Sequence, residues 1–130
     1  MKLNQDCIRD LMLYLEDNLT LSNSIEINCY TNKSFLEKYS VDDLRYTVLR
    51  LVEAGYLNVT INQFIDTSIP YIDIKSITFS GHKFLDTIRD DKVWTKTKSI
   101  LSSFKSVSIE LVSETAAKVI TSLINQQTNP

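Results

Sequence analysis

The stretch Ser40–Ile61, SVDDLRYTVLRLVEAGYLNVTI, predicts a helix followed by a strand. Ser40 and Asp43 form a partial capping box, which places a side-chain acceptor and a carboxylate at the positive end of the helix. Apolar residues then recur with helical spacing at Val41, Leu44, Val48, Leu51 and Val52. Gly55 stands where a left-handed residue commonly ends a helix, and residues 56–61 alternate apolar with polar as a strand does.

The segments before this helix predict three short elements. An amphipathic helix begins near the N-terminus and ends at Asn18. Its apolar side comprises Leu3, Cys7, Ile8, Leu11, Tyr14 and Leu15. Residues 24–30 alternate as a strand, and residues 32–39 are predicted to form a short helix.

After a polar loop, residues 71–79 predict a second strand that forms a hairpin with the first. The apolar phase shifts between Ile74 and Ile77, which predicts a β-bulge or bend there. The order of elements is typical of a winged helix, with 40–54 in the position of the recognition helix and 56–79 as the wing. The short helix before residue 40 would complete the helix-turn-helix pair.

The stretch Thr78–Lys98, TFSGHKFLDTIRDDKVWTKTK, contains the only histidine and the only tryptophan of the chain. We expect Thr78 to cap a helix over 79–89, with Gly81 allowing a close approach to its neighbour. The inward-pointing residues of that helix are predicted to be Phe79, Leu85 and Ile88. These residues would fasten the hairpin to the helices that follow.

Two further amphipathic helices are predicted over 91–104 and 108–124. The apolar side of the first comprises Val93, Trp94, Thr97, Ile100, Leu101 and Phe104, so the indole is expected to be buried. The apolar side of the second comprises Ile109, Val112, Ala116, Val119, Ile120 and Leu123. Residues 125–130 are expected to fray.

The expected fold is therefore α+β and mostly α: a winged helix with C-terminal helices packed on it. A chain of 130 residues, 43% of them apolar, can bury a single core. We expect residues 1–90 to form the winged-helix domain and residues 91–130 a helical extension of the same compact unit. No apolar run is long enough to span a membrane, and no signal peptide is predicted, so we expect a cytoplasmic protein.

The candidates for catalysis or metal binding are few. His82, Asp86 and Asp90 are spaced to lie along one helix face, as a metal-binding column or a proton-transfer pair requires. No second histidine or thiolate cluster completes such a site, and Ser80 lacks the surroundings of a nucleophile. A polar ladder on the helix is the favoured interpretation. Cys7 and Cys29 do not have the spacing of metal ligands and are interpreted as small apolar residues that fill the core. From these candidates together, we expect neither enzyme activity nor a cofactor or metal.

Charge separates two candidate binding surfaces. The net charge is −2, but residues 40–74 carry −3 and residues 75–105 carry +4. The outward side of the helix over 40–54 is predicted to present Asp42, Asp43, Tyr46, Arg50 and Glu53. Tyr46 and Arg50 could contact a base and Arg45 a phosphate, although the three carboxylates make this helix a poor match for DNA.

The basic alternative is the predicted helix over 91–104. Lys92, Lys96 and Lys98, with neighbouring serines and threonines, form a face that could bind phosphates without sequence preference, or could simply be solvated. The last helix either completes the core or pairs with its copy in a homodimer.

A resemblance covers most of the chain and is strongest over 44–98. Residues 77–98 are similar to a signature of the phage and bacterial family called domain of unknown function 2513 (DUF2513). The matching residues are Thr78, Gly81, His82, Phe84, Leu85, Asp86, Ile88, Arg89, Asp90 and Trp94. Residues 49–57, LRLVEAGYL, resemble the preceding leucine-rich helix of the family. The resemblance implies a winged-helix fold and a phage or prophage setting, and it carries over no catalytic or binding residue.

Two hypotheses for function remain open. The first is a small winged-helix regulator or accessory factor that acts at DNA. The second is a protein-interaction module in which the acidic helix binds a host or phage protein, for example as an inhibitor, without contacting DNA. The DNA hypothesis stands slightly ahead, on the analogy of fold alone.

Overall fold

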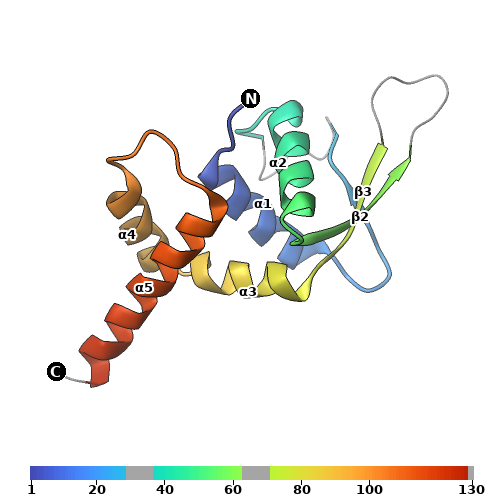
Figure 1. Ribbon diagram of the computed structural model, residues 1–130. Helices are drawn as coiled ribbons and strands as arrows, with labels where there is room; N and C mark the ends of the chain where they lie inside the picture. Colours follow the sequence, from blue (N-terminus) through green and yellow to red (C-terminus); the bar gives the residue numbers. More distant parts are fainter. Residues whose placement is uncertain (29–36, 63–70, 129–130) are drawn as a thin grey trace. The chain divides into compact units, whose positions relative to one another are not determined.

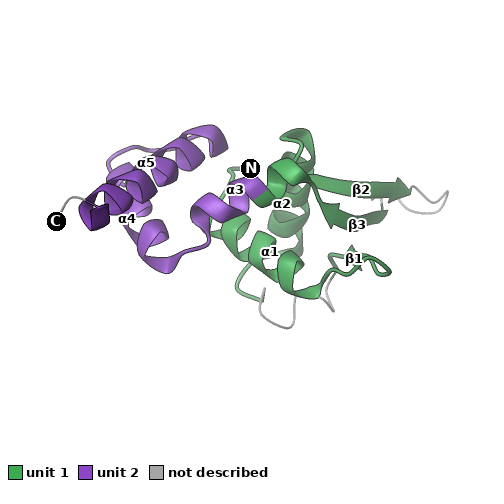
Figure 2. Cartoon of the chain, turned by 90° about the horizontal axis from the view of Figure 1, so that it is seen from below, with its two compact units in different colours: residues 1–82 green, residues 83–130 purple. Residues whose placement is uncertain are grey.

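A computed structural model describes residues 1–28, 37–62 and 71–128 of the chain. The chain divides into two compact units, residues 1–82 and residues 83–130 (Figure 2). The described residues form five helices and a three-stranded antiparallel sheet, so the expected α+β, mostly helical class is confirmed. The boundary between the units lies inside a helix and precedes the expected one after residue 90.

The first unit combines two helices, the start of a third, and the sheet (Figure 1). In chain order its complete elements are α1 (Gln5–Asn18), β1 (Ile25–Glu26), α2 (Val41–Glu53), β2 (Leu57–Asn62) and β3 (Tyr71–Ile77). The strand order is β1-β3-β2, with β3 in the centre. Its buried apolar residues are Cys7, Ile8, Leu11, Met12, Leu15, Ile27, Leu44, Val48, Leu51, Leu57, Ile72 and Ile74. The two helices and the sheet thus share one core, formed largely by the residues whose periodicity predicted these elements.

Local capping sets the ends of both complete helices. The side chain of Asn4 accepts a hydrogen bond from the amide of Cys7 at the start of α1, and Asn18 is its last residue, as predicted. Ser40 Oγ accepts from the amide of Asp43 at 3.0 Å, which confirms the predicted cap of α2. Gly55 has a φ of 82°, the left-handed conformation predicted for the residue that ends this helix.

The hairpin of β2 and β3 contains the predicted irregularity. Asn58 pairs with Ser76, whereas the next residue, Val59, pairs with Ile74. Lys75 is therefore the extra residue on β3, in the interval where the apolar phase shifts. The bulge lets the residues on both sides of it keep their apolar side chains toward the core.

The turn between the hairpin and α3 (Phe79–Ile88) is held by Thr78. Its Oγ1 accepts from the amide of Gly81 at 2.9 Å and donates to the carbonyl of Gly55 at 2.6 Å. The prediction that Phe79 points inward is wrong, because its side chain is 87% exposed. At about 100° per residue, Phe79 lies half a turn away from the buried Ile88.

The second unit contains the rest of α3, α4 (Asp91–Leu101) and α5 (Ile109–Thr128), and Figure 1 shows α4 and α5 packed together. Its buried apolar residues are Phe84, Leu85, Ile88, Val93, Trp94, Val112, Ala116 and Val119. The side chain of Asp90 caps α4 by accepting from the amides of Lys92 and Val93. Trp94 is 6% exposed, so its predicted burial is confirmed.

Three predictions for the second unit are wrong. The helix expected over 91–104 ends at Leu101, so Phe104 lies beyond the helical period and is exposed. Ile100 is also exposed, and nothing in the structure explains this. The expected frayed tail is helical as far as Thr128, since no glycine or proline interrupts residues 125–128.

Some predictions fall on residues that the structure does not describe. Most of the short helix expected over 32–39, the end of the strand expected over 24–30, and Cys29 all lie outside the described residues. Within the described ranges, no helix combines the length and the apolar character needed to cross a bilayer.

Candidate interaction surfaces

The outward side of α2 brings Tyr46, Arg50 and Glu53 together. Arg50 Nη2 lies 2.7 Å from Glu53 Oε1, one helical turn away. The guanidinium carbon of Arg50 lies 5.2 Å from the centre of the Tyr46 ring, within the range of a cation–π contact. The predicted base-contacting pair is therefore present, but its cation already has two partners on its own helix.

The second cation of α2 is also engaged. Arg45 Nη1 donates to the carbonyl oxygen of Ile27 at 3.4 Å, and the side chain is half-buried. Arg45 lines a small enclosed apolar space together with Val48 and Ile74. This arginine connects α2 to the chain segment after β1 and is not directed freely into solvent.

The carboxylates of α2 lie on its exposed side, and one of them, Glu53, pairs with Arg50. Asp42, Asp43 and Glu53 are all exposed, and we call these three residues the acidic face of α2. Asp42 and Asp43 lie in the first turn, where a negative charge is favoured by the helix dipole. Asp42 and Asp43 thus stabilise their own helix and give this surface a negative potential.

A lysine face lies on α4 in the other unit. Lys92, Lys96 and Lys98 are exposed, as predicted. Lys92 and Lys96 are one turn apart and line an open depression together with Asp91, Thr95 and Ser99. In the described parts of the chain, neither Lys92 nor Lys96 forms an ion pair. We call Lys92, Lys96 and Ser99 the lysine face of α4.

The histidine–aspartate column is not a site in the described residues. Arg89 Nη1 pairs with Asp86 Oδ1 at 2.5 Å, and Asp90 is the cap of α4. His82 is exposed and lines a separate cleft with Glu16 and Lys75. Among residues 1–28, 37–62 and 71–128, no three potential metal ligands converge. The two aspartates therefore have architectural roles.

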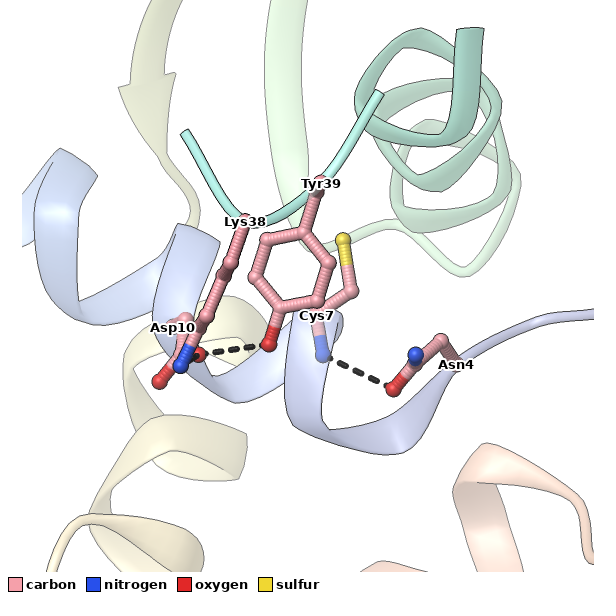
Figure 3. Close-up of polar contacts among 5 residues, drawn as sticks. All are labelled: Asn4, Cys7, Asp10, Lys38 and Tyr39. Carbon is pink, nitrogen blue, oxygen red and sulfur yellow. Dashed lines mark hydrogen bonds and ion pairs between the residues drawn. The ribbon is translucent and has the colours of Figure 1, made fainter. Parts of the chain in front are cut away.

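A cluster that the sequence did not predict connects α1 to the segment before α2 (Figure 3). Tyr39 Oη donates to Asp10 Oδ2 at 2.6 Å, and Lys38 Nζ lies 2.8 Å from the same oxygen. The side chain of Asp10 is only 13% exposed. Burial, and then the bond to the Asp10 carboxylate, raise the pKa of Tyr39 well above the usual tyrosine value. The hydrogen bond to Asp10 also raises the pKa of Lys38.

A buried polar contact lies close to this cluster. Cys7 Sγ is 3.4 Å from Thr47 Oγ1, and the Thr47 hydroxyl donates to the carbonyl of Asp43 at 2.7 Å. Burial raises the pKa of the Cys7 thiol, so this cysteine is an unreactive packing residue, as the sequence analysis interpreted it. The only sequence signal for the cluster was a charged residue, Asp10, beside the apolar stripe of the first helix.

Comparison with known proteins identifies the family to which the chain belongs. The model of the family described as "Hypothetical protein (DUF2513)" matches residues 2–108. The chain belongs to the DUF2513 family. This DUF2513 protein is also similar to an uncharacterized protein of Haemophilus influenzae (strain Rd), with 26% identity over 126 residues, which cover 97% of this chain and 98% of the relative. No solved structure matches the chain.

Proposed function

We propose that this DUF2513 protein is a small winged-helix binding protein that recognises a basic protein partner through the acidic face of α2. The order α1–β1–α2–β2–β3 and the strand order β1-β3-β2 support the winged-helix assignment. In that assignment α2 occupies the recognition position and the hairpin is the wing. On the resemblance to phage and bacterial proteins alone, we further propose a phage or prophage origin and a cytoplasmic site of action.

One observation carries the choice of a protein partner over groove reading by α2. Both arginines of this helix, Arg45 and Arg50, are bound within the chain. Three carboxylates are exposed on the same helix, and two of them, Asp42 and Asp43, pair with neither arginine. A helix that reads the major groove normally offers free Arg, Lys, Asn or Gln side chains to bases.

Electrostatics favours a basic protein over DNA as the partner of the acidic face. Each carboxylate brought near a phosphate costs on the order of 1 kcal/mol even when screened. To contact a base, Arg50 would also have to leave Glu53 and Tyr46. A partner that presents Lys or Arg meets no such penalty, because its cations would pair with the acidic face and increase the rate of association.

The lysine face of α4 favours a second candidate function, namely binding of DNA phosphates without sequence preference. Lys92 and Lys96 are exposed and lie together on one open surface with hydroxyl groups. Binding of this kind weakens steeply with salt, since each neutralised phosphate releases counterions. It would not use α2.

Retention on non-specific duplex DNA separates the candidates. We expect the wild-type protein to show no retention at about 50 mM salt. Retention that is lost in a Lys92→Ala/Lys96→Ala/Lys98→Ala variant would establish the second candidate. Retention that is lost in Arg50→Ala, but kept in the lysine variant, would overturn the proposed role of α2.

A capture experiment tests the protein partner directly. The tagged wild-type protein is compared with an Asp42→Asn/Asp43→Asn variant, and Asp17→Asn serves as the control at an exposed aspartate of α1. We expect a nuclease-resistant partner rich in Lys and Arg to be retained by the wild type and the control but lost by the double variant. Equal capture by all three proteins would contradict the role of the acidic face.

A further inference from the structure

Among the described residues, the outer edge of β2 is an unpaired sheet edge. In the three-stranded sheet, β3 lies between the other two strands, so β2 hydrogen-bonds on one side only. Within the described part of the chain, no strand pairs with its other side, and Figure 2 shows β2 at the margin of the sheet. Along Leu57–Asn62, every second residue therefore directs its backbone N–H and C=O groups away from the sheet.

This edge lacks the features that usually prevent pairing with another chain. Exposed edges commonly carry lysine, proline or a bulge. The sequence of β2, LNVTIN, contains no charged residue and no proline, and the bulge of the hairpin lies on β3 at Lys75. The outer edge of the strand is therefore available as a template.

The side chains of β2 are also incompletely covered. Leu57, Val59 and Ile61 point to the face of the sheet that contains the core, but burial decreases along the strand. Leu57 is 3% exposed and Ile61 is 52% exposed, although Ile61 pairs with the buried Ile72. The core therefore covers the start of β2 at Leu57 but leaves the apolar side chain of Ile61 exposed near its end.

We infer that the outer edge of β2 pairs antiparallel with the same edge of a second copy of this chain. The two sheets then join into one six-stranded sheet in the order β1-β3-β2-β2-β3-β1, related by a twofold axis. The unpaired backbone groups of both edges satisfy one another, and Ile61 gains a neighbour from the other copy.

The sequence of β2 restricts the register. Residues directly opposite each other in antiparallel strands point to the same face, so apolar positions must face apolar positions. A twofold axis through any residue of β2 achieves this, and the axis through Thr60 also pairs all five residues from Asn58 to Asn62. Val59 then faces Ile61 of the second copy, Asn58 faces Asn62, and Thr60 faces Thr60, which is a favourable type of cross-strand pair.

Self-pairing fits this edge better than pairing with a charged strand. A charged strand would gain no ionic partner on β2, since its six residues are neutral. A copy of β2 introduces no like charges and supplies the same alternation of apolar and polar side chains. The occupant is therefore the strand itself, by an isologous contact.

Sedimentation of the full chain over about 1 μM to about 1 mM tests the inference. We expect a monomer–dimer equilibrium in the wild type and a dissociation constant raised at least about tenfold in Thr60→Lys, which places two like charges opposite each other. Thr121→Lys, at an exposed position of α5, is the matched control and should dimerise normally. If Thr60→Lys changes the circular dichroism spectrum, Thr60→Glu provides the same test.

Disulfide trapping checks the register. Residues on a twofold axis between antiparallel strands have Cα atoms about 4.5 to 5.5 Å apart, within the range of a disulfide. Thr60→Cys should therefore form an oxidised dimer far faster than Asn58→Cys or the wild type. A wild-type monomer at about 1 mM would overturn the inference. So would a dimer that Thr60→Lys leaves intact, which would indicate another surface such as α5.

Discussion

The backbone of Gly81 lies directly against the carbonyl oxygen of Tyr56, with no room for a β-carbon between them. A β-carbon on Gly81 would overlap that oxygen and would lie 2.7 Å from Ile77 Cγ2. The same carbonyl accepts a hydrogen bond from the amide of Thr78 at 3.0 Å. The first turn of α3 is thus fixed to the chain segment between α2 and β2, and this contact depends on the absence of a side chain.

The first prediction concerns Gly81→Ala. Alanine favours a helix over glycine by about 1 kcal/mol, so at an open site the change would stabilise the protein. Here the overlap involves backbone atoms, which cannot rotate away, and forced overpacking costs about 1 to 3 kcal/mol. We expect a net loss of stability in urea denaturation followed by circular dichroism. Ser80→Ala, one residue earlier and exposed, should change stability by less than about 0.5 kcal/mol. A Gly81→Ala protein more stable than the wild type would show that the contact is absent.

The second prediction concerns the hydroxyl of Thr78, which accepts from Gly81 and donates to Gly55. Thr78→Val keeps the shape of the side chain but removes both hydrogen bonds. Loss of a helix cap costs about 1 kcal/mol, and a second lost hydrogen bond adds about as much. Thr78→Ser retains the hydroxyl, so it should lie closer to the wild type in the same denaturation experiment. Equal stability of the valine and serine variants would mean that the hydroxyl contributes nothing.

The comparison with the sequence shows which features are local. Ser40, Asp90 and Gly55 act within a few residues of the positions where they stand, as Thr78 does when it caps α3, so sequence patterns predicted these roles. The bond from Thr78 to Gly55 spans 23 positions and was not predicted. The bulge at Lys75 was also predictable, because a shift in the period-two pattern must be absorbed within the strand. Winged-helix topology, in contrast, was an inference from the order of elements.

The features that were not predicted from the sequence are contacts between residues far apart in the chain, or cases in which a side chain could bind one of several partners. Asp10 and Tyr39 are 29 positions apart, and no local rule brings them together. Arg50 was predicted as a free outward cation, yet Tyr46 and Glu53 stand at i−4 and i+3, where helix neighbours interact. That spacing was visible in the sequence and would have predicted that the arginine is occupied.

The third prediction concerns the capping role of Asp90, with the only tryptophan of the chain as the probe. The Asp90 carboxylate accepts from two amides at the start of α4, and Trp94, a few residues later, is buried. Asp90→Ala should destabilise the second unit by about 1 kcal/mol. Asp90→Asn keeps an equivalent cap and loses only the favourable charge at the helix start, so its effect should be smaller. The stability of both variants can be measured in urea from the red shift of Trp94 fluorescence on unfolding. A larger effect of asparagine than of alanine would contradict the capping role.

The fourth prediction is a pH dependence that arises from Tyr39. Its pKa is raised in the folded protein, by burial first and by the bond to Asp10 second, whereas in the unfolded chain it is about 10. Below about pH 10 both states hold the proton, and the hydrogen bond contributes fully to stability. As pH rises through this value, the unfolded state releases its proton and the folded state does not. The free energy of unfolding must then fall with pH.

Tyr39→Phe isolates this contribution, since phenylalanine cannot donate to Asp10 or lose a proton. At about pH 7 the variant should be less stable than the wild type by about 1.5 to 3 kcal/mol, the range for a hydrogen bond to a charged group. Between about pH 9 and pH 11 the difference should shrink, because only the wild type has this tyrosine to ionise in the unfolded state. All other ionisable groups are present in both proteins, so their contributions largely cancel in the difference. Urea denaturation across this interval provides the measurement, and a difference that stays constant or grows with pH would mean that Tyr39 does not keep its proton in the folded protein.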